Sequence, residues 1–158
     1  MSAAELWVES YQGEVLGEAV FGALAEGEVD ADRRHQLEVL TLLERTTKEL
    51  ADPVFDRRGL DRGDTPATLA AARELAAAVS GITWEEFVAS ILPVTEQFLV
   101  TYHRLVELAP DDVEREVAEA YVAHEEALAA FARRSLGDEV GEPLEAVLAL
   151  PHVATALA

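Results

Sequence analysis

The chain has no cysteine among its 158 residues. Disulfides, thiolate metal sites and cysteine nucleophiles are therefore excluded, and cysteine pairing gives no information about the redox compartment. Basic residues are also scarce, with 12 against 31 acidic ones, which gives a formal net charge of −19. Such a chain repels phosphate backbones and anionic lipid, and no basic cluster interrupts the acidity. We therefore expect no nucleic-acid partner.

Long hydrophobic runs are missing as well. No uncharged apolar stretch approaches the roughly 20 residues that a membrane span needs, and Met1–Glu5 lacks the basic and apolar regions of a secretion signal. We therefore expect a cytoplasmic protein with no membrane partner, whose acidity keeps it in solution. The hydrophobic content of 50% is enough to close one core, so residues 1–158 are expected to form a single domain.

No segment alternates polar and apolar residues with period two, whereas apolar residues recur three and four positions apart over long stretches. Asp30 is a suitable N-cap, and Thr83 with Glu86 forms a capping box. Pro93 is expected to bend the helix that contains it. The pattern predicts four long helices, at about residues 4–26, 31–50, 83–108 and 112–136.

The connections between these helices predict their arrangement. Short turns join the first helix to the second and the third to the fourth, so each pair should be antiparallel. The pairs are separated by some thirty residues that include an alanine-rich helix from Thr65 to Ser80, and a last short helix begins near Pro143. Such a connection has to carry the chain back along the length of the bundle. We therefore expect an all-α, ferritin-like four-helix bundle.

Rotating each helix by about 100° per residue predicts which polar side chains face inward. Burying an isolated carboxylate or imidazolium is costly, so such groups pair, take up a proton or coordinate a cation. Convergence of several such groups therefore predicts a chemical site. Each long helix has one acid or imidazole among its apolar residues, and these are Glu14, Glu44, Glu96 and His124.

These positions resemble the ferritin-like di-iron carboxylate superfamily, including its rubrerythrin and aldehyde-deformylating branches. The family pattern has a glutamate on the first helix, often preceded by glycine and followed seven residues later by an aromatic residue. Gly13-Glu14 with Phe21 matches this pattern, and Gly17-Glu18 is a second possible register. The third helix of the family carries another glutamate, for which Glu96 is the candidate.

The family also carries Glu-x-x-His on its second and fourth helices, and here each motif is half retained. Glu44 is followed by Thr47 in place of the imidazole, and His124 is preceded by Tyr121 in place of the acid. Two of the six family ligands are therefore replaced. Three acids and one histidine suit one cation well, whereas two cations would lack ligands unless Glu18, His103 or water supplied them.

The resemblance implies an oxidoreductase or oxygenase that binds iron or manganese and acts on a small molecule enclosed in the bundle. It implies a metal set of Glu14, Glu44, Glu96 and His124, of which Glu44, Glu96 and His124 would be catalytic. The expected substrate pocket consists of Trp7, Tyr11, Glu18, Thr47, His103 and Tyr121.

A second hypothesis remains open from the sequence. In it the bundle holds no metal and either binds a small apolar ligand or a partner protein, or performs acid/base chemistry with its buried carboxyl groups. Under this hypothesis a homodimer is possible, because alanine-rich stripes permit close approach of helices.

Overall fold

The computed structural model describes all of residues 1–158, and it is helical throughout, with no strand. None of its helices combines the length and the apolar character needed to cross a membrane. The helices are α1 (Ala3–Gly27), α2 (Ala31–Leu50), α3 (Asp52–Arg58), α4 (Thr65–Val79), α5 (Trp84–Leu108), α6 (Asp112–Ser135), α7 (Glu145–Leu148) and α8 (Pro151–Leu157).

The ends of the long helices are set by capping side chains. Asp30 accepts a hydrogen bond from the backbone N–H of Arg33 at the start of α2. At the start of α5, Thr83 and Glu86 satisfy each other's backbone N–H groups in the predicted capping box. The four predicted long helices are confirmed within one or two residues, and Pro93 lies inside α5.

One short helix was not expected. The connection between the two helix pairs was expected to contain one helix, from Thr65 to Ser80, yet Asp52–Arg58 also forms a helix, α3. Its proline lies in the first turn, where the missing N–H costs nothing. Gly59 ends the helix with φ of 63°, a left-handed conformation that glycine adopts readily.

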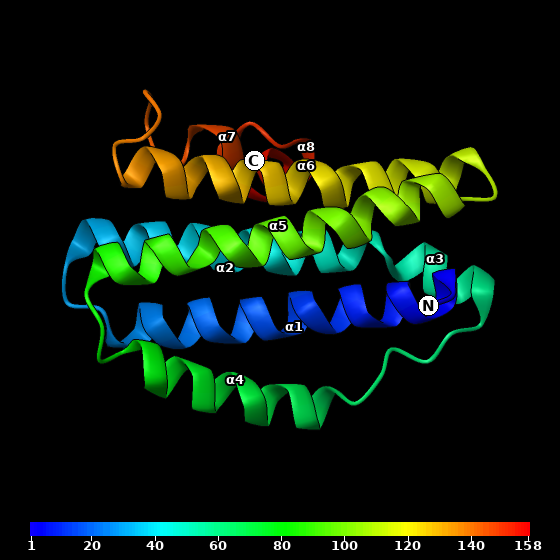
Figure 1. Cartoon of the computed structure of the whole chain (residues 1–158), viewed down its shortest axis with the longest axis horizontal. Coiled ribbons are helices and arrows are strands. Elements are labelled where there is room, and N and C mark those ends of the chain that lie inside the picture. Colours follow the sequence, from blue (N-terminus) through cyan, green and yellow to red (C-terminus); the bar gives the residue numbers. More distant parts are fainter.

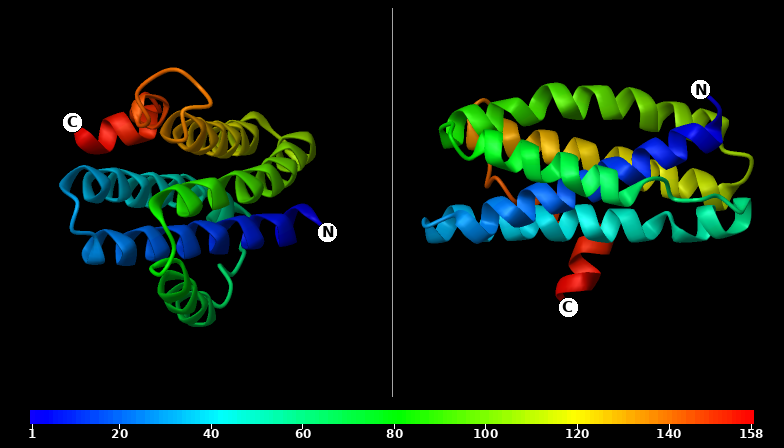
Figure 2. Two further views of the ribbon diagram at one scale, coloured as in Figure 1. Left: turned by 60° about the vertical axis from the view of Figure 1, so that its left-hand side comes forward. Right: turned by 90° about the horizontal axis from the view of Figure 1, so that it is seen from below.

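Two pairs of helices lie side by side (Figures 1 and 2). Helices α1 and α2 run in opposite directions, as do α5 and α6, and the members of each pair pack along their length. Helix α4 carries the chain back along the molecule on the outer side of α1. On the opposite side, α7 packs against α6 and α8 packs against α2.

The interior is divided along its length into two hydrophobic clusters. The first contains Leu37, Leu40, Leu43 and Phe131, and it is covered by α7 and α8. The second contains Trp7, Phe55, Tyr102 and Tyr121 near the other end of the helices. On every long helix, buried polar residues lie between the residues of the first cluster and those of the second. This polar layer includes Ser10, Glu14, Glu44, Thr47, Thr95, His124 and Glu125, all of them buried.

Candidate metal centre

Four titratable side chains from three helices meet in the polar layer, and we call them the carboxylate/histidine cluster. Glu14 comes from α1, Glu44 from α2, and the neighbours His124 and Glu125 from α6. None of the four residues is more than 5% exposed. Each helix has apolar side chains on the same face, so burying that face also buries the polar residue. Glu14, Glu44 and His124 were predicted to face inward, and the structure brings them together.

The imidazole of His124 lies at the centre of the cluster. Its Nδ1 lies 3.3 Å from Oε1 of Glu14 and 3.8 Å from Oε1 of Glu125. Its Nε2 lies 3.4 Å from Oε2 of Glu44. The hydroxyl of Tyr102 on α5 donates a hydrogen bond of 3.1 Å to Oε1 of Glu14. The two ring nitrogens therefore face different acids, with two carboxylates on the Nδ1 side and one on the Nε2 side.

The Nδ1 side of the cluster has the donors and dimensions of a cation site. Glu14, His124 and Glu125 each offer one donor atom, and these atoms lie within 4.8 Å of one another. Donors that share a cation at about 2.1 Å lie roughly 3 to 4.3 Å apart, so small side-chain rotations would close the site. Carboxylate oxygens with an imidazole suit iron or manganese.

Several atoms of the cluster are buried and have no hydrogen-bond partner. They are Oε2 of Glu14, Oε2 of Glu125 and both ring nitrogens of His124. Buried polar atoms are nearly always paired, since leaving one unpaired costs roughly 1–3 kcal/mol. A cation between Glu14, Glu125 and Nδ1 of His124 would give these groups a partner, so the residues fit a metal ion.

Burial and mutual contact shift the pKa values of the cluster. Burial, and then the nearby charge of Glu44, raise the pKa of Glu14 well above its usual value. Burial likewise raises the pKa of Glu125 to about 8. Burial disfavours ionisation of Glu44 and His124 too, but their attraction lowers the pKa of Glu44 and raises the pKa of His124. Without a cation, Glu125 therefore holds a proton at neutral pH and the environment of Glu14 favours its neutral form, whereas the contact between Glu44 and His124 favours the charged form of each.

A cavity of about 290 Å³ ends on this cluster. Glu14, Glu44, Glu125 and Tyr102 form its polar end. Leu75 and Val79 of α4 also contribute to its lining, so α4 covers part of this cavity. An apolar cavity with a few convergent polar groups is typical of a small-molecule site. Its apolar wall includes Leu16, Val20, Phe21, Phe87, Ile91, Val94, Phe98 and Leu128.

The predicted inward position of Glu96 is wrong. Glu96 is exposed, as are Ala89 and His103 on the same row of α5. Val100, which suggested that this row was apolar, is 74% exposed. The buried face of α5 lies about one residue step round the helix and consists of Phe87, Val88, Ile91, Thr95, Tyr102 and Leu105. Helix α5 was expected to contribute the carboxylate of Glu96 to the cluster, but the side chain that it contributes is the phenol of Tyr102.

None of the six residues expected in the substrate pocket lines the cavity at the cluster. His103 is exposed, and Glu18 is half-buried and forms an ion pair with Lys48. Trp7 and Tyr121 are fully buried and pack edge to face with ring centroids 5.6 Å apart. The half-buried ring of Tyr11 lies 5.1 Å from the ring of Phe55. These aromatic side chains fill the second hydrophobic cluster or pack at its edge.

Thr47, which was expected in the substrate pocket, contacts another side chain of the protein. It is fully buried one turn after Glu44, and its Oγ1 lies 2.9 Å from Nε2 of His152 on α8. Burial, and then the charge of His124, lower the pKa of His152 to about 4, so this imidazole is neutral at physiological pH. His152 lies 105 residues from Thr47 in sequence, so no local sequence pattern predicts this contact.

Glu125 is the cluster residue that the sequence analysis missed. Its neighbours three and four positions away are Leu128 and Tyr121, both buried, and Ala118 and Ala132 continue the same row. This row was a usable signal. The buried face of α6 is wider than the stripe centred on His124, so it includes both His124 and Glu125.

Comparisons with family models, with curated proteins and with solved structures find no match to this chain. The assignment of a function therefore depends on the geometry of the cluster and its cavity.

Proposed function

We propose that this chain is a ferritin-like four-helix bundle in which the carboxylate/histidine cluster binds one iron or manganese ion. The bundle is made by α1, α2, α5 and α6, with α4 as the long return connection. The observation that supports the metal most directly is the set of unpartnered buried donors on Glu14, His124 and Glu125. In this proposal the protein is an oxidoreductase that acts on a small apolar molecule in the adjoining cavity.

Each residue of the cluster has a distinct task in this proposal. Glu14, Glu125 and Nδ1 of His124 are the ligands. The carboxylate of Glu44 faces Nε2 at 3.4 Å, and its negative charge favours a proton on that nitrogen, which leaves Nδ1 free to bind a cation. Tyr102 orients the carboxylate of Glu14 through its hydroxyl. A bound iron or manganese ion supplies electron-transfer and oxygen chemistry at this point.

The cavity provides the other requirement of such chemistry. Its lining is mainly apolar, which favours a substrate without charge. Glu125 and Glu14 both line the cavity, so a bound molecule reaches the ligand side of the cluster directly. Glu44 also lines it, on the far side of the imidazole of His124. The substrate would therefore lie in van der Waals contact with the leucine and phenylalanine wall while its reactive end meets the carboxylates.

Metal analysis of matched variants tests this proposal. The protein is purified without chelators from medium that contains iron and manganese, and the metal content per chain is measured. Glu125→Gln removes a ligand, whereas Glu126→Gln changes the exposed neighbour and serves as the control. We expect about one equivalent of iron or manganese in the native chain and the control, and an affinity lower by roughly tenfold or more in Glu125→Gln. Absence of metal, or zinc alone, would contradict an oxidoreductase, since zinc has no redox chemistry.

A second candidate function is supported by the same cavity without a cation. Glu14, Glu44 and Glu125 meet at the end of an apolar space, where a carboxyl group could exchange a proton with a bound molecule. In this case the native chain would contain no metal, yet Glu125→Gln would still abolish turnover of a ligand. The metal analysis therefore separates the two candidates.

A further inference from the structure

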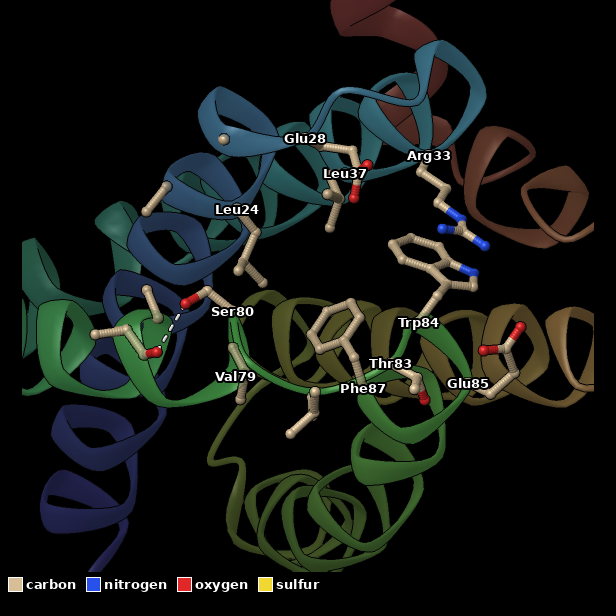
Figure 3. A pocket seen from close by; sticks show the side chains of 15 residues that line it. Leu24, Glu28, Arg33, Leu37, Val79, Ser80, Thr83, Trp84, Glu85 and Phe87 are labelled. Carbon is tan, nitrogen blue, oxygen red and sulfur yellow. Dashed lines mark hydrogen bonds between the residues drawn. The ribbon is translucent and has the colours of Figure 1, made fainter.

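A second cavity lies at the end of the molecule where α2 and α5 begin, and it shares no residue with the carboxylate/histidine cluster. It has a volume of about 650 Å³, within the range of roughly 300–1,000 Å³ typical of small-molecule sites. Leu24, Leu37, Val79 and Phe87 line its interior, and Arg33 and Trp84 stand at one side (Figure 3).

Arg33 is the unusual residue of this cavity. Its guanidinium lies over the indole ring of Trp84, 5.4 Å from the ring centroid. It forms no ion pair and its side chain makes no hydrogen bond, although the chain has 31 acidic residues. Seven of the twelve basic residues do form ion pairs, and they are Lys48, Arg57, Arg58, Arg62, Arg104, Arg115 and Arg134.

The other four arginines that form no ion pair are more exposed than Arg33. Arg33 is half-buried and lines a cavity. Because it is stacked on an aromatic ring, its planar group is held in one orientation and loses little freedom when it binds a carboxylate. The others are all exposed, and they are Arg34, Arg45, Arg73 and Arg133.

The charges around the cavity limit the ligand to a single negative charge. Glu28 and Glu85 also line it, so a doubly charged head group would be repelled. The carboxylate of Glu28 is already engaged, since its Oε1 accepts the backbone N–H of Asp30. Glu85 is exposed at the rim. The fork of N–H donors on Arg33 matches a carboxylate in the geometry of two parallel hydrogen bonds.

We propose that this cavity binds an amphipathic monocarboxylate, with its head group on Arg33 and its apolar body against Leu24, Leu37 and Phe87. The site does not depend on the metal centre. Val79 and Phe87 also line the cavity that ends on the cluster, so the apolar body lies one side-chain layer away from it.

Calorimetric titration of the full-length protein with decanoate tests this assignment, with decanol and decyl phosphate as probes of different charge. Arg33→Gln removes the proposed partner, and Arg73→Gln removes the same charge from an exposed position on α4 that lines neither cavity. We expect decanoate to bind Arg33→Gln about tenfold more weakly than the native chain or Arg73→Gln. Decanol should bind these three proteins alike, and decyl phosphate at pH 8 should bind the native chain more weakly than decanoate.

Tryptophan fluorescence locates the binding. The chain has two tryptophans, and Trp7 is fully buried in the second hydrophobic cluster. Decanoate should therefore change the emission of the native chain and not that of Trp84→Phe. Equal affinity of decanoate for Arg33→Gln and Arg73→Gln would overturn the assignment. A change in the emission of Trp84→Phe as large as the change in the native chain would also overturn it. Metal content measured on the same samples is independent of either result.

Discussion

Gly17 on α1 lies directly against the carboxylate of Glu44 on α2. A Cβ atom at position 17 would lie 2.7 Å from Cδ of Glu44, closer than non-bonded atoms approach. The absence of a side chain at Gly17 is therefore what admits the carboxylate to the interface between the two helices, beside the imidazole of His124. The backbone of Gly17 is helical and would accept a residue with a side chain, so the space for Glu44 is what requires glycine here.

Gly17→Ala should displace the carboxylate of Glu44 from His124. We expect the free energy of unfolding to fall by about 1–3 kcal/mol, because a buried group has to move in a packed interior. Gly22→Ala is the matched control, since its Cβ would make only an ordinary contact with Thr41 and alanine favours the helix by about 0.5–1 kcal/mol. Urea unfolding of both variants measures the difference. Equal stability of the two variants would show that Glu44 does not occupy this position.

Metal binding should release protons from the cluster. Burial raises the pKa of Glu14 and of Glu125, and contact with Glu44 and Glu125 raises the pKa of His124 against the effect of burial. A cation requires ionised carboxylates and a free Nδ1, so the proton that Glu125 holds at neutral pH has to leave. Calorimetric titration with Mn²⁺ at pH 7 in buffers of different ionisation enthalpy should report about one proton or more released per ion. A heat that does not depend on the buffer would exclude these ligands.

Without metal, Glu125 should make stability depend on pH. Its pKa is about 8 in the folded protein, whereas a glutamate in an unfolded chain titrates near ~4.3. Between these values the folded state holds a proton that the unfolded chain has released, so the contribution of Glu125 to the free energy of unfolding falls as pH rises.

Glu125→Gln removes this dependence. In chelator, we expect the stability of Glu125→Gln relative to the native chain to increase by roughly 2–4 kcal/mol between pH 5 and pH 8. Urea unfolding at both pH values gives the comparison, and Glu126→Gln should show no such increase. A constant difference between Glu125→Gln and the native chain would mean that Glu125 ionises normally.

Much of the fold could be predicted from the sequence because it is encoded locally. Hydrophobic periodicity and capping residues such as Asp30 and Thr83 define the long helices, and these signals need no knowledge of distant contacts. The inward positions of Glu14, Glu44 and His124 followed from the same periodicity.

The remainder of the site depends on which faces the helices present to one another. On α5, the apolar residues Ala89 and Val100 are exposed although they share a row with Glu96, so this row predicted the wrong side of the helix for Glu96. On α6, burial is wide enough to include both His124 and Glu125. The contact of Thr47 with His152 joins segments far apart in sequence, and no local pattern predicts it.

Tyr102→Phe should weaken metal binding without unfolding the protein. The hydroxyl of Tyr102 favours the ionised form of Glu14, which is the form that binds a cation, so its removal raises the pKa of Glu14 further. We expect the affinity for Mn²⁺ at pH 7 to fall by roughly tenfold. Tyr11→Phe is the control, because Tyr11 does not line the cavity. If both variants bind Mn²⁺ equally well, Glu14 is not a ligand.

Anomalous diffraction at the iron and manganese edges, on crystals of protein purified without chelators, tests the central claim most directly. We predict a single anomalous peak about 2.0–2.3 Å from a carboxylate oxygen of Glu14, a carboxylate oxygen of Glu125 and Nδ1 of His124. Glu44 should not contact the ion, because it lies at Nε2, on the opposite side of the imidazole ring. A cluster without a peak at either edge, or a peak bound to other residues, would contradict the metal centre.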